Sequence, residues 1–566
     1  MGRFARVAPP LPVSGLFTYE VPPELARRVV PGVRVLVPFG SQRLAATTVG
    51  VDDQPPPPGV ASKPLLRLLD DEPVAGPDIL QLTAWVATAT GCSWGEALDA
   101  ALPPAVKSGR AGRSIEEIVL LQDPRLVRPQ VDELQARREK QARALRILAE
   151  RGGALPVREL MNLAHVSRSP LDSLVRGGLC TLRLARAERE PLLGRDVAPT
   201  QPLELTPEQQ ACKATLVSAL ERAFATGPGG AGAGRAFLLF GITGSGKTEV
   251  YLQTLAECVA AGRQGIVLVP EISLTPQTVR RFRERFERVA VLHSHLTDAE
   301  RGGYWRRVAS GHVQVVVGAR SAVFAPTRKL GLIVIDEEHE HTFKQESTPR
   351  YHARDVAVMR ARLEGIPILM GSATPSLESW SNAARGNYTL LSLPSRVEDR
   401  PLPKVKIVDL RHEPKPTGKH FAIGPTLEAA MNKTLKEKGQ IILLLNRRGF
   451  STHVHCQACG HVAQCANCDL ALTFHRTKSS LMCHYCGFET APFQKCPACS
   501  QPTMRYQGLG TEKLQAEIEE KFPGFVCQRM DSDTMTRPGS HERVLDAFRA
   551  GHVHILMGTQ MIAKGL

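Results

Sequence analysis

The eight residues from Gly241 to Thr248 constrain the fold of this 566-residue chain more than any other segment. They read Gly-Ile-Thr-Gly-Ser-Gly-Lys-Thr, follow the apolar run 236–240 and precede the helix-forming sequence 249–252. A strand, this loop and a helix form the context in which the G-x-x-x-x-G-K-[ST] pattern binds phosphate. An ordinary glycine-rich turn would not require all three parts. The segment therefore predicts a nucleotide-binding α/β fold.

Each position of this loop has an expected task. Glycines at 241, 244 and 246 let backbone N–H groups curl around an anion, because no Cβ stands in the way. Lys247 is predicted to reach the β- and γ-phosphates, and the Thr248 hydroxyl to hold Mg²⁺. The nucleotide-contacting residues predicted from the motif are Gly241, Thr243, Gly244, Ser245, Gly246, Lys247 and Thr248.

A second motif lies at 331–339, where an apolar run ends in Asp-Glu-Glu-His. An unbroken apolar run suits a parallel strand that is covered on both faces, and ligands of open α/β sheets bind at the carboxyl ends of such strands. Asp336 is therefore predicted to hold Mg²⁺, and Glu337 to orient and deprotonate the attacking water. A solvated acidic strand end would explain one carboxylate but hardly three. The pair of motifs predicts ATP hydrolysis.

Length and composition limit the number of domains, the kind of partner and the cellular location. At this length we expect about three to five domains. The formal net charge of +15 favours a polyanionic partner, although many basic proteins bind no nucleic acid. No apolar run of about 18 residues occurs, and the N-terminal sequence lacks the apolar centre of a signal peptide. We therefore expect a cytoplasmic protein that has no membrane partner.

Eight of the thirteen cysteines fall between Cys456 and Cys499. They form four C-x-x-C pairs, and each pair offers two thiolates, half of a tetrahedral zinc shell. A disulfide framework is the alternative, but an intracellular chain with C-x-x-C repeats favours metal. We predict two structural Cys₄ zinc sites made from Cys456, Cys459, Cys465, Cys468, Cys483, Cys486, Cys496 and Cys499.

The remaining segments predict further domains before and after these motifs. Short alternating runs at 32–39 and 45–49, with helical patterns at 76–90 and 95–101, predict a small β-rich module with helices. Three helical patterns and a strand at 179–184 predict a winged helix, which either reads duplex DNA or only packs between other domains. From 204 on, strands and helices alternate as in a doubly wound parallel sheet. A second such lobe uses 440–445, 525–530 and 553–557, and the cysteine block is inserted into it.

The two lobes, the Asp-Glu-Glu-His segment and Gly-Ser-Ala-Thr at 371–374 resemble the superfamily 2 helicases. The eight cysteines after Asn-Arg-Arg-Gly-Phe at 446–450 narrow the resemblance to the PriA family, the primosomal proteins N′ of bacteria. It extends over essentially the whole chain. Its most specific blocks are 268–277, 318–324, 350–355, 508–512 and 558–561.

The resemblance implies further roles. Gln209 would contact adenine, and His339 with Ser372 and Thr374 would couple hydrolysis to strand movement. The family's aromatic-rich loop, which senses DNA, corresponds to 341–354. Cys456/Cys459 would share one zinc with Cys496/Cys499, and the inner pairs the other. The implied DNA-binding residues are Phe17, Tyr19, Gly40 and Lys63 in the domain that grips a 3′ end, and Arg320, Phe343, Lys344 and Tyr351 in the first lobe.

The predicted fold class is thus α/β, with two RecA-like doubly wound lobes, the second incomplete, a zinc-binding insertion, a β-rich DNA-binding module and a winged helix. The expected function is an ATP-dependent 3′-to-5′ DNA helicase that binds stalled or abandoned forks and initiates primosome assembly. The predicted domains are 1–105 (3′-DNA-end binding), 114–195 (winged helix), 200–395 (ATP-binding lobe), 396–455 with 500–566 (second lobe) and 456–499 (zinc module).

Two other functions fit the same motifs. One is a DNA-stimulated ATPase that remodels forks without unwinding, and the other is a fork-binding scaffold that needs little hydrolysis. The chain ends inside a helicase block, before the family's arginine finger, so we expect it alone to bind ATP and hydrolyse it poorly. Expected partners are forked and single-stranded DNA, single-stranded-DNA-binding protein and primosome or helicase-loading proteins, with the chain itself monomeric.

Overall fold

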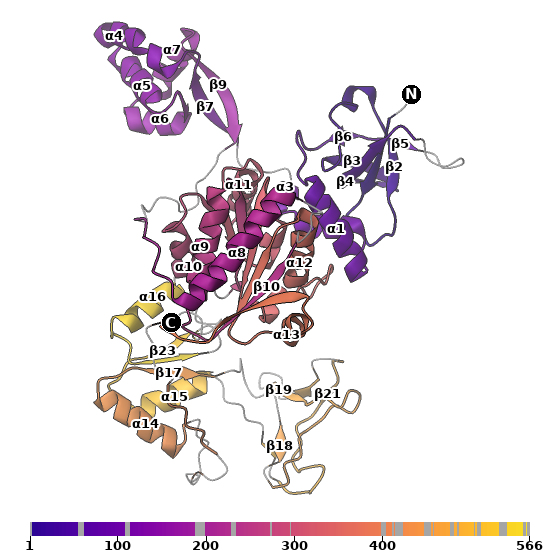
Figure 1. Ribbon diagram of the computed structural model, residues 1–566, viewed down its shortest axis with the longest axis vertical. Helices are drawn as coiled ribbons and strands as arrows, with labels where there is room; N and C mark the ends of the chain where they lie inside the picture. The colour runs from indigo at the N-terminus through magenta and orange to yellow at the C-terminus, as the bar shows by residue number, and fades with distance from the viewer. Residues whose placement is uncertain are drawn as a thin grey trace. The chain divides into compact units, whose positions relative to one another are not determined.

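The computed structural model divides into two compact units, residues 1–400 and 401–566, which are described separately (Figure 1). The description covers 3–54, 62–107, 114–186, 198–227, 234–271, 274, 276–294, 296–397, 403–409, 413, 423–445, 454–456, 458–475, 480–483, 486–502, 504–505, 511–530, 540–558 and 562. The predicted family blocks at 446–450, 508–510 and 559–561 lie outside these residues. Among the described residues, no helix is long and apolar enough to cross a membrane.

The N-terminal module is a mixed six-stranded sheet with the order β5-β2-β1-β4-β3-β6. The predicted strands and helices are present, whereas β1, β2, η1, α3 and the two-residue edge strands β5 and β6 are additions. Valines and alanines on alternating positions of the strands fill its core. The elements are β1 (Arg3–Ala8), β2 (Phe17–Val21), η1 (Pro23–Leu25), β3 (Arg34–Phe39), β4 (Gln42–Asp52), β5 (Lys63–Pro64), β6 (Arg67–Leu68), α1 (Pro77–Thr90), α2 (Trp94–Ala101) and α3 (Pro104–Lys107).

The predicted winged helix is also present, and the strands β7 and β8, the short η2 and the helix α4 are additions. Its strand β9 pairs along its length with β7, which precedes the helices in sequence, and β8 pairs with the other edge of β7. Leucines from three helices form its separate core. The elements are β7 (Ser114–Leu120), η2 (Pro124–Leu126), α4 (Arg128–Arg137), α5 (Glu139–Glu150), β8 (Ala154–Pro156), α6 (Val157–Ala164), α7 (Arg168–Arg176) and β9 (Cys180–Arg186).

The first lobe contains a seven-stranded parallel sheet with the order β12-β13-β11-β14-β15-β10-β16. The apolar runs at 236–240 and before Asp336 form strands of this sheet, as predicted. Strand β16 was not predicted, because three of its six residues are exposed at the sheet edge and the apolar signal is weak. The strands are β10 (Ala236–Gly241), β11 (Gln264–Leu268), β12 (Val289–Leu292), β13 (Val315–Gly318), β14 (Leu330–Asp336), β15 (Ile368–Ser372) and β16 (Tyr388–Leu393).

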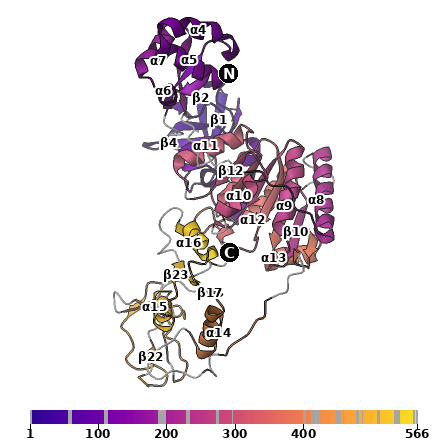
Figure 2. The same ribbon diagram turned by 90° about the vertical axis from the view of Figure 1, so that its left-hand side faces the viewer.

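Helices cover both faces of this sheet (Figures 1 and 2). One buried cluster joins the sheet to α8, α9 and α10. The other joins it to α11, α12 and η4, and it also takes in α1, α2 and α3 of the N-terminal module. The elements are α8 (Pro207–Thr226), α9 (Lys247–Ala260), α10 (Pro276–Arg283), α11 (Asp298–Ala309), η4 (Arg320–Phe324), η5 (His341–Phe343), α12 (Ala353–Glu364) and α13 (Leu377–Ala384).

In the second unit, three predicted strands form a parallel sheet with the order β17-β24-β23. Helices α14 and α15 pack on one cluster and α16 on another. The elements are α14 (Pro425–Lys436), β17 (Ile441–Leu444), α15 (Thr511–Lys521), β23 (Cys527–Met530), α16 (Ser540–Arg549) and β24 (Ile555–Gly558).

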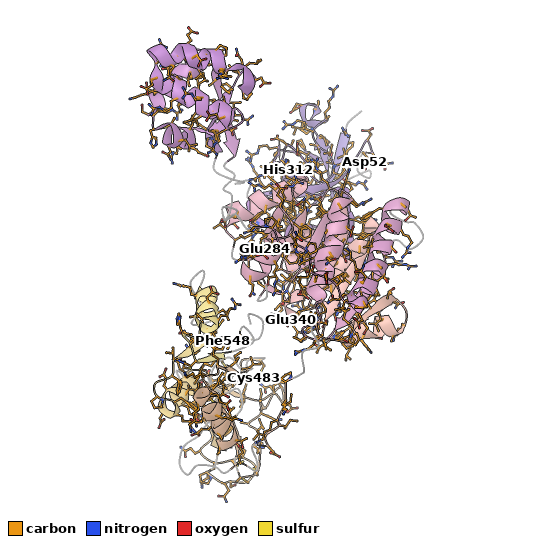
Figure 3. The ribbon with its side chains drawn as sticks, turned by 60° about the vertical axis from the view of Figure 1, so that its left-hand side comes forward. Asp52, Glu284, His312, Glu340, Cys483 and Phe548 are labelled. Atoms are coloured by element: carbon orange, nitrogen blue, oxygen red, sulfur yellow. The ribbon has the colours of Figure 1, made fainter. Side chains whose placement is uncertain are left out.

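The cysteine-rich module lies between β17 and α15 in sequence and consists of short antiparallel strands (Figure 3, where Cys483 is labelled). These are β18 (His455–Cys456), β19 (Thr473–His475), β20 (Ser480–Met482), β21 (Glu489–Thr490) and β22 (Met504–Arg505). The predicted α/β fold with a cysteine-rich insertion is confirmed.

Candidate functional site

The phosphate loop connects the end of β10 to the first turn of α9. Gly244 and Gly246 adopt left-handed φ values of 85° and 78°, which residues with a Cβ rarely accept. Helix α9 begins at Lys247, so the loop places backbone N–H groups at a helix N-terminus, where anions bind. The Lys247 ammonium donates to the Gly241 carbonyl over 2.8 Å. The loop therefore has the backbone shape that its sequence predicts.

Two segments distant in sequence contact this loop. The Gln209 amide nitrogen donates to the Ser245 carbonyl over 2.9 Å, while its oxygen accepts from the Thr206 N–H in the capping box of α8. Arg396 Nε donates to the Thr243 carbonyl over 3.0 Å. Gln209 is buried against the loop, and its contact with adenine stays a prediction.

The acidic motif lies beside the loop because β15 alone separates β14 from β10. Asp336 ends β14 and pairs in register with Gly371 of β15. Burial, and secondarily the Glu337 charge, raises the pKa of Asp336 to about 6. Burial lowers the pKa of Lys247, and the two carboxylates oppose this shift. A desolvated carboxylate next to a phosphate-binding loop fits a divalent cation, with Asp336 and Thr248 as the protein groups that would hold it.

Glu337 adopts a left-handed φ of 50°, a strained conformation for a residue with a side chain. Its N–H donates to Asp336 Oδ1 over 3.1 Å. His339 Nδ1 lies 2.8 Å from the Ser372 hydroxyl, which also accepts from the Thr374 N–H over 2.9 Å. The residues predicted to couple hydrolysis to movement therefore form one hydrogen-bonded chain, starting two residues after Glu337.

Two site residues were not predicted. Tyr251 is fully buried and its hydroxyl lies 3.3 Å from Asp336 Oδ1. It stands one helical turn after Lys247 on α9, so the i, i+4 spacing could have identified it. A Cβ at Gly371 would lie 1.5 Å from the Tyr251 hydroxyl, which explains the glycine there.

Glu338, the second residue, is completely buried. Its carboxylate accepts from the Ser376 N–H at 2.7 Å, from the Ser379 hydroxyl at 2.7 Å and from Arg354 Nη1 at 3.2 Å. The third acid of the motif thus ties β14 to α13 and α12, whereas Asp336 and Glu337 face the phosphate loop.

The two aromatic residues predicted to bind DNA in the loop 341–354 are buried. Phe343 and Tyr351 are only 1% and 3% exposed, and Tyr351 packs edge-to-face on Phe324. Both rings pack into the core in this conformation, so they would have to move to stack on bases, and their DNA contact stays a prediction. The same burial raises the pKa of Tyr351 to about 12.

The cationic side chains of this region lie closer to the surface. Lys344 is exposed, and its ammonium donates to the Arg350 carbonyl over 2.5 Å. Arg320 Nη1 donates to the Lys344 carbonyl over 2.6 Å and lines a pocket of about 130 Å³ together with Arg301, Thr342 and an edge of Phe343. Their DNA contacts stay predictions.

The four predicted positions of the N-terminal module gather at one side of its sheet. Phe17 packs edge-to-face on Phe39, next to Gly40, which turns the chain with a φ of 59°. The Tyr19 hydroxyl donates to the Pro38 carbonyl over 2.9 Å, and Tyr19 pairs in register with the exposed Lys63. The Tyr19–Pro38 hydrogen bond joins β2 to β3, although β1 and β4 lie between these strands in the sheet. The sheet is therefore strongly curved.

The eight clustered cysteines form two groups of four whose sulfurs lie within 4.8 Å of one another. Neighbouring sulfurs stand 3.5–3.7 Å apart, close to the spacing of about 3.8 Å that a tetrahedron with Zn–S bonds of about 2.3 Å requires. None of the described cysteines forms a disulfide. The donor set fits zinc, and the grouping is the predicted one: Cys456, Cys459, Cys496 and Cys499 in one group, and Cys465, Cys468, Cys483 and Cys486 in the other.

Three families match parts of the chain. A 3′DNA-binding domain (3′BD) matches residues 6–103, a DEAD/DEAH box helicase matches 222–382, and the PriA DNA helicase Cys-rich region (CRR) domain matches 465–490. These matches coincide with the curved sheet, the seven-stranded lobe and the centre of the cysteine module.

The chain is also similar over most of its length to curated proteins. It is 36% identical to the replication restart protein PriA of Bacillus subtilis, over 97% of this chain and 75% of that protein. It is 34% identical to the protein of the same name from Haemophilus influenzae, over 100% of this chain and 75% of that protein.

Among solved structures, RecG bound to a three-way DNA junction matches 63% of this chain and 36% of that chain, with 17% identity and a TM-score of 0.34. Yeast Dbp5 bound to RNA and ADP BeF3 matches 64% of this chain and 76% of that chain, with 14% identity and a TM-score of 0.33. At these scores we draw no argument from either similarity.

Proposed function

The chain belongs to the PriA family of replication restart proteins, and on that premise we propose that it is an ATP-dependent 3′-to-5′ DNA helicase. In this proposal it binds stalled or abandoned forks and initiates primosome assembly. One observation carries the proposal. The sheet matched by a 3′DNA-binding domain and the lobe that holds the phosphate loop belong to one compact unit, joined by a shared core.

The proposed ATP binding and hydrolysis use five residues of the first lobe. Lys247 and the N–H groups of the phosphate loop bind the β- and γ-phosphates, which the glycine geometry favours. Thr248 and Asp336 would hold Mg²⁺, which when bound neutralises charge on the phosphates. Glu337 orients the attacking water and takes its proton. Gln209, already buried against the loop, would present its amide to adenine.

Coupling to DNA is proposed to run through His339, Ser372 and Thr374. Their hydrogen bonds join the residues next to Glu337 to the end of β15. A displacement at one end of this hydrogen-bonded chain then displaces the residues at its other end.

The proposed DNA contacts differ between regions. In the first lobe, Arg320 and Lys344 bind phosphates, while the buried Phe343 and Tyr351 shape the loop that carries Lys344. In the N-terminal module, Phe17, Tyr19, Gly40 and Lys63 surround the terminal nucleotide of a 3′ end.

The remaining predictions also enter the proposal. The zinc module and the winged helix bind DNA and partner proteins, among them single-stranded-DNA-binding protein and primosome proteins. The chain acts as a monomer in the bacterial cytoplasm, on the nucleoid. The domains are 1–105, 114–195, 200–395, 396–455 with 500–566, and 456–499.

Equilibrium binding to a fork tests the central part of this proposal. Fluorescence anisotropy is measured with forks whose leading strand ends in a 3′-hydroxyl or in a 3′-phosphate. We expect tighter binding to the 3′-hydroxyl fork, and Lys63→Ala should remove most of that preference. Arg67→Ala is the matched control, because it removes the same charge from the opposite edge strand of the sheet. Equal binding of both forks by the wild-type protein would reject 3′-end recognition.

A further inference from the structure

Helix α12 contacts both the acidic motif and the N-terminal module. It spans Ala353–Glu364, so its first two residues are the last two of the loop 341–354. Two arginines on it, Arg354 and Arg360, are 8% and 1% exposed. They stand about 9 Å apart along the helix axis, since each residue adds about 1.5 Å. Buried arginines are rare unless every donor has a partner, so their partners identify what the helix holds.

Arg354 holds the acidic motif. Its Nη1 donates to Glu338 Oε2 over 3.2 Å and to the Ser376 hydroxyl over 2.6 Å. Glu338 follows Asp336 and Glu337 directly in sequence. The start of α12 is therefore fixed to the strand that carries the proposed magnesium ligand and general base.

Arg360 holds the N-terminal module. Its Nη2 donates to Asp78 Oδ2 over 3.3 Å, and Asp78 lies in the first turn of α1, 282 residues earlier in the sequence. The other donors of Arg360 reach Glu364 at 2.7 Å, the carbonyls of Val323 and Ala325 at 2.6 and 2.9 Å, and the Thr327 hydroxyl at 3.0 Å. One guanidinium thus joins α1, α12 and the segment that follows Arg320.

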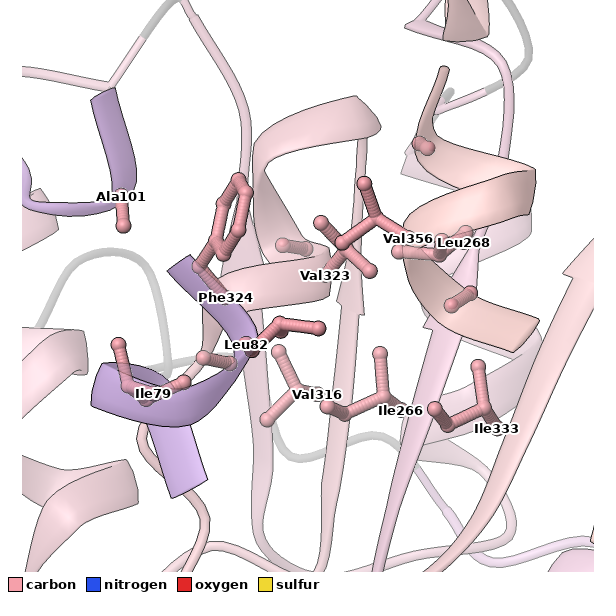
Figure 4. Packing of buried hydrophobic residues seen from close by; sticks show 14 of the residues in the cluster. Ile79, Leu82, Ala101, Ile266, Leu268, Val316, Val323, Phe324, Ile333 and Val356 are labelled. Carbon is pink, nitrogen blue, oxygen red and sulfur yellow. The ribbon is translucent and has the colours of Figure 1, made fainter. Parts of the chain in front are cut away.

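Apolar packing accompanies this polar contact. Ile79, Leu82 and Ala101 of the N-terminal helices share a cluster with Phe324 and Val356 of the first lobe (Figure 4). Close-packed interiors transmit displacements, because they have few alternative arrangements. The helices α1 and α2 and helix α12 should therefore move together.

We propose that α12 couples occupancy of the 3′-end site to the nucleotide site, with the Arg360–Asp78 contact as its link to the N-terminal module and the Arg354–Glu338 contact as its link to the acidic motif. The inference rests on the proposed function. Asp78 and Arg360 act as positioning residues and touch neither ligand. Because coupling between two binding sites is reciprocal, a bound 3′ end must change nucleotide affinity by the same factor as nucleotide changes 3′-end affinity.

The test measures that factor without requiring hydrolysis. The dissociation constant of a fluorescent, slowly hydrolysed ATP analogue with Mg²⁺ is measured with the full chain saturated by a short oligonucleotide ending in a 3′-hydroxyl or in a 3′-phosphate. For the wild-type chain we expect the two constants to differ by about fivefold or more, a typical coupling. Asp78→Ala should reduce the difference below about twofold while 3′-hydroxyl binding itself is kept.

Asp71→Ala is the matched control. Asp71 pairs with Arg28 on the surface of the same module, and among the described residues it forms no ion pair with α12. Arg360 keeps Glu364 and Thr327 in the Asp78→Ala chain, so its charge stays paired. If Asp78→Ala unfolds the module, Asp78→Asn, which removes the charge and keeps the size, replaces it.

Each outcome decides one question. Loss of coupling in Asp78→Ala alone supports the proposal. Full coupling in Asp78→Ala, or a wild-type chain that prefers the 3′-hydroxyl but shows no coupling, overturns the role of α12 and leaves the proposed function standing. A wild-type chain without any 3′-hydroxyl preference rejects both. Loss of 3′-hydroxyl binding in both Asp78 variants would show that the contact maintains the module only, and would overturn the coupling role.

Discussion

The proposed ATP site and the cysteine-rich module are held together in different ways. The proposed ATP site stands at the ends of three neighbouring parallel strands whose two faces are buried in large clusters. The cysteine-rich module has strands of two or three residues and a buried cluster in which cysteines are members. Burial of apolar surface fixes the first region, whereas the second has too little of it and relies on its thiols.

This difference implies that metal removal and core substitutions act on separate regions. Stripping zinc should unfold the cysteine-rich module and leave the first unit intact. Truncating a buried side chain of the first lobe should destabilise that lobe and leave the cysteine-rich module intact.

The largest effect is expected from zinc removal, since structural zinc contributes about 10–16 kcal/mol of folding free energy per site in small domains. Elemental analysis should give two zinc ions per chain, and a chelator should abolish hydrogen-exchange protection within 454–505 but not in β14. Cys465→Ser should reduce the count, and Cys527→Ser, which changes a cysteine outside both groups, should not. One zinc or none in undamaged wild-type protein would contradict this account.

Phe343→Ala should destabilise the first lobe by about 3–5 kcal/mol, because it empties a fully buried aromatic position. Hydrogen exchange of β14 amides would report the change as faster exchange. Phe525→Ala is the control, since Phe525 is 38% exposed and should cost much less. If Phe343→Ala leaves exchange in β14 unchanged and instead weakens DNA binding, Phe343 stacks on bases after all.

Lys247→Ala should lower ATPase activity of the full-length protein by about 10²–10³-fold, the usual loss when one preorganised charge-stabilising donor is removed. Fork affinity should stay within several-fold, because it depends on phosphate contacts elsewhere. Steady-state hydrolysis and anisotropy check both statements. Lys213→Ala removes a lysine of α8 that pairs with Glu257 of α9. This variant should retain normal hydrolysis.

Tyr251→Phe should have the smallest effect, because one hydrogen bond contributes about 0.5–1.5 kcal/mol. We expect the Mg²⁺ concentration for half-maximal ATPase to rise by about two- to tenfold, with little change in the maximal rate, since the hydroxyl positions Asp336 and does not react. Tyr304→Phe, on the buried face of α11, should leave the Mg²⁺ dependence unchanged. An unchanged Mg²⁺ dependence in Tyr251→Phe would exclude a positioning role for this hydroxyl.

The two regions also differ in how far sequence alone describes them. The phosphate loop is contiguous, and its glycine spacing encodes the φ values that the structure shows. The C-x-x-C spacing identifies ligand pairs but not how the pairs combine, and the family resemblance supplied that step. Both motifs are local, which is why their prediction succeeded.

Contacts between distant segments were harder to predict. The burial of Phe343 and Tyr351 depends on Phe324 and α12, and no periodicity in the loop reveals it. The Arg360–Asp78 contact joins segments of opposite ends of the first unit, so neither residue stands out in sequence. Strand β7 was missed as the partner of β9 because it precedes the helices that it accompanies. In each case tertiary packing, not local pattern, decides the outcome.

Strand displacement by the full-length protein tests the central claim most directly. Partial duplexes with either a 3′ or a 5′ single-stranded tail are incubated with ATP, using wild-type protein and Lys247→Ala as the hydrolysis-deficient control. The account predicts ATP-dependent unwinding only when the single-stranded tail ends in 3′, and none by Lys247→Ala. DNA-stimulated hydrolysis without displacement from either substrate, or displacement that requires a 5′ tail, would contradict it.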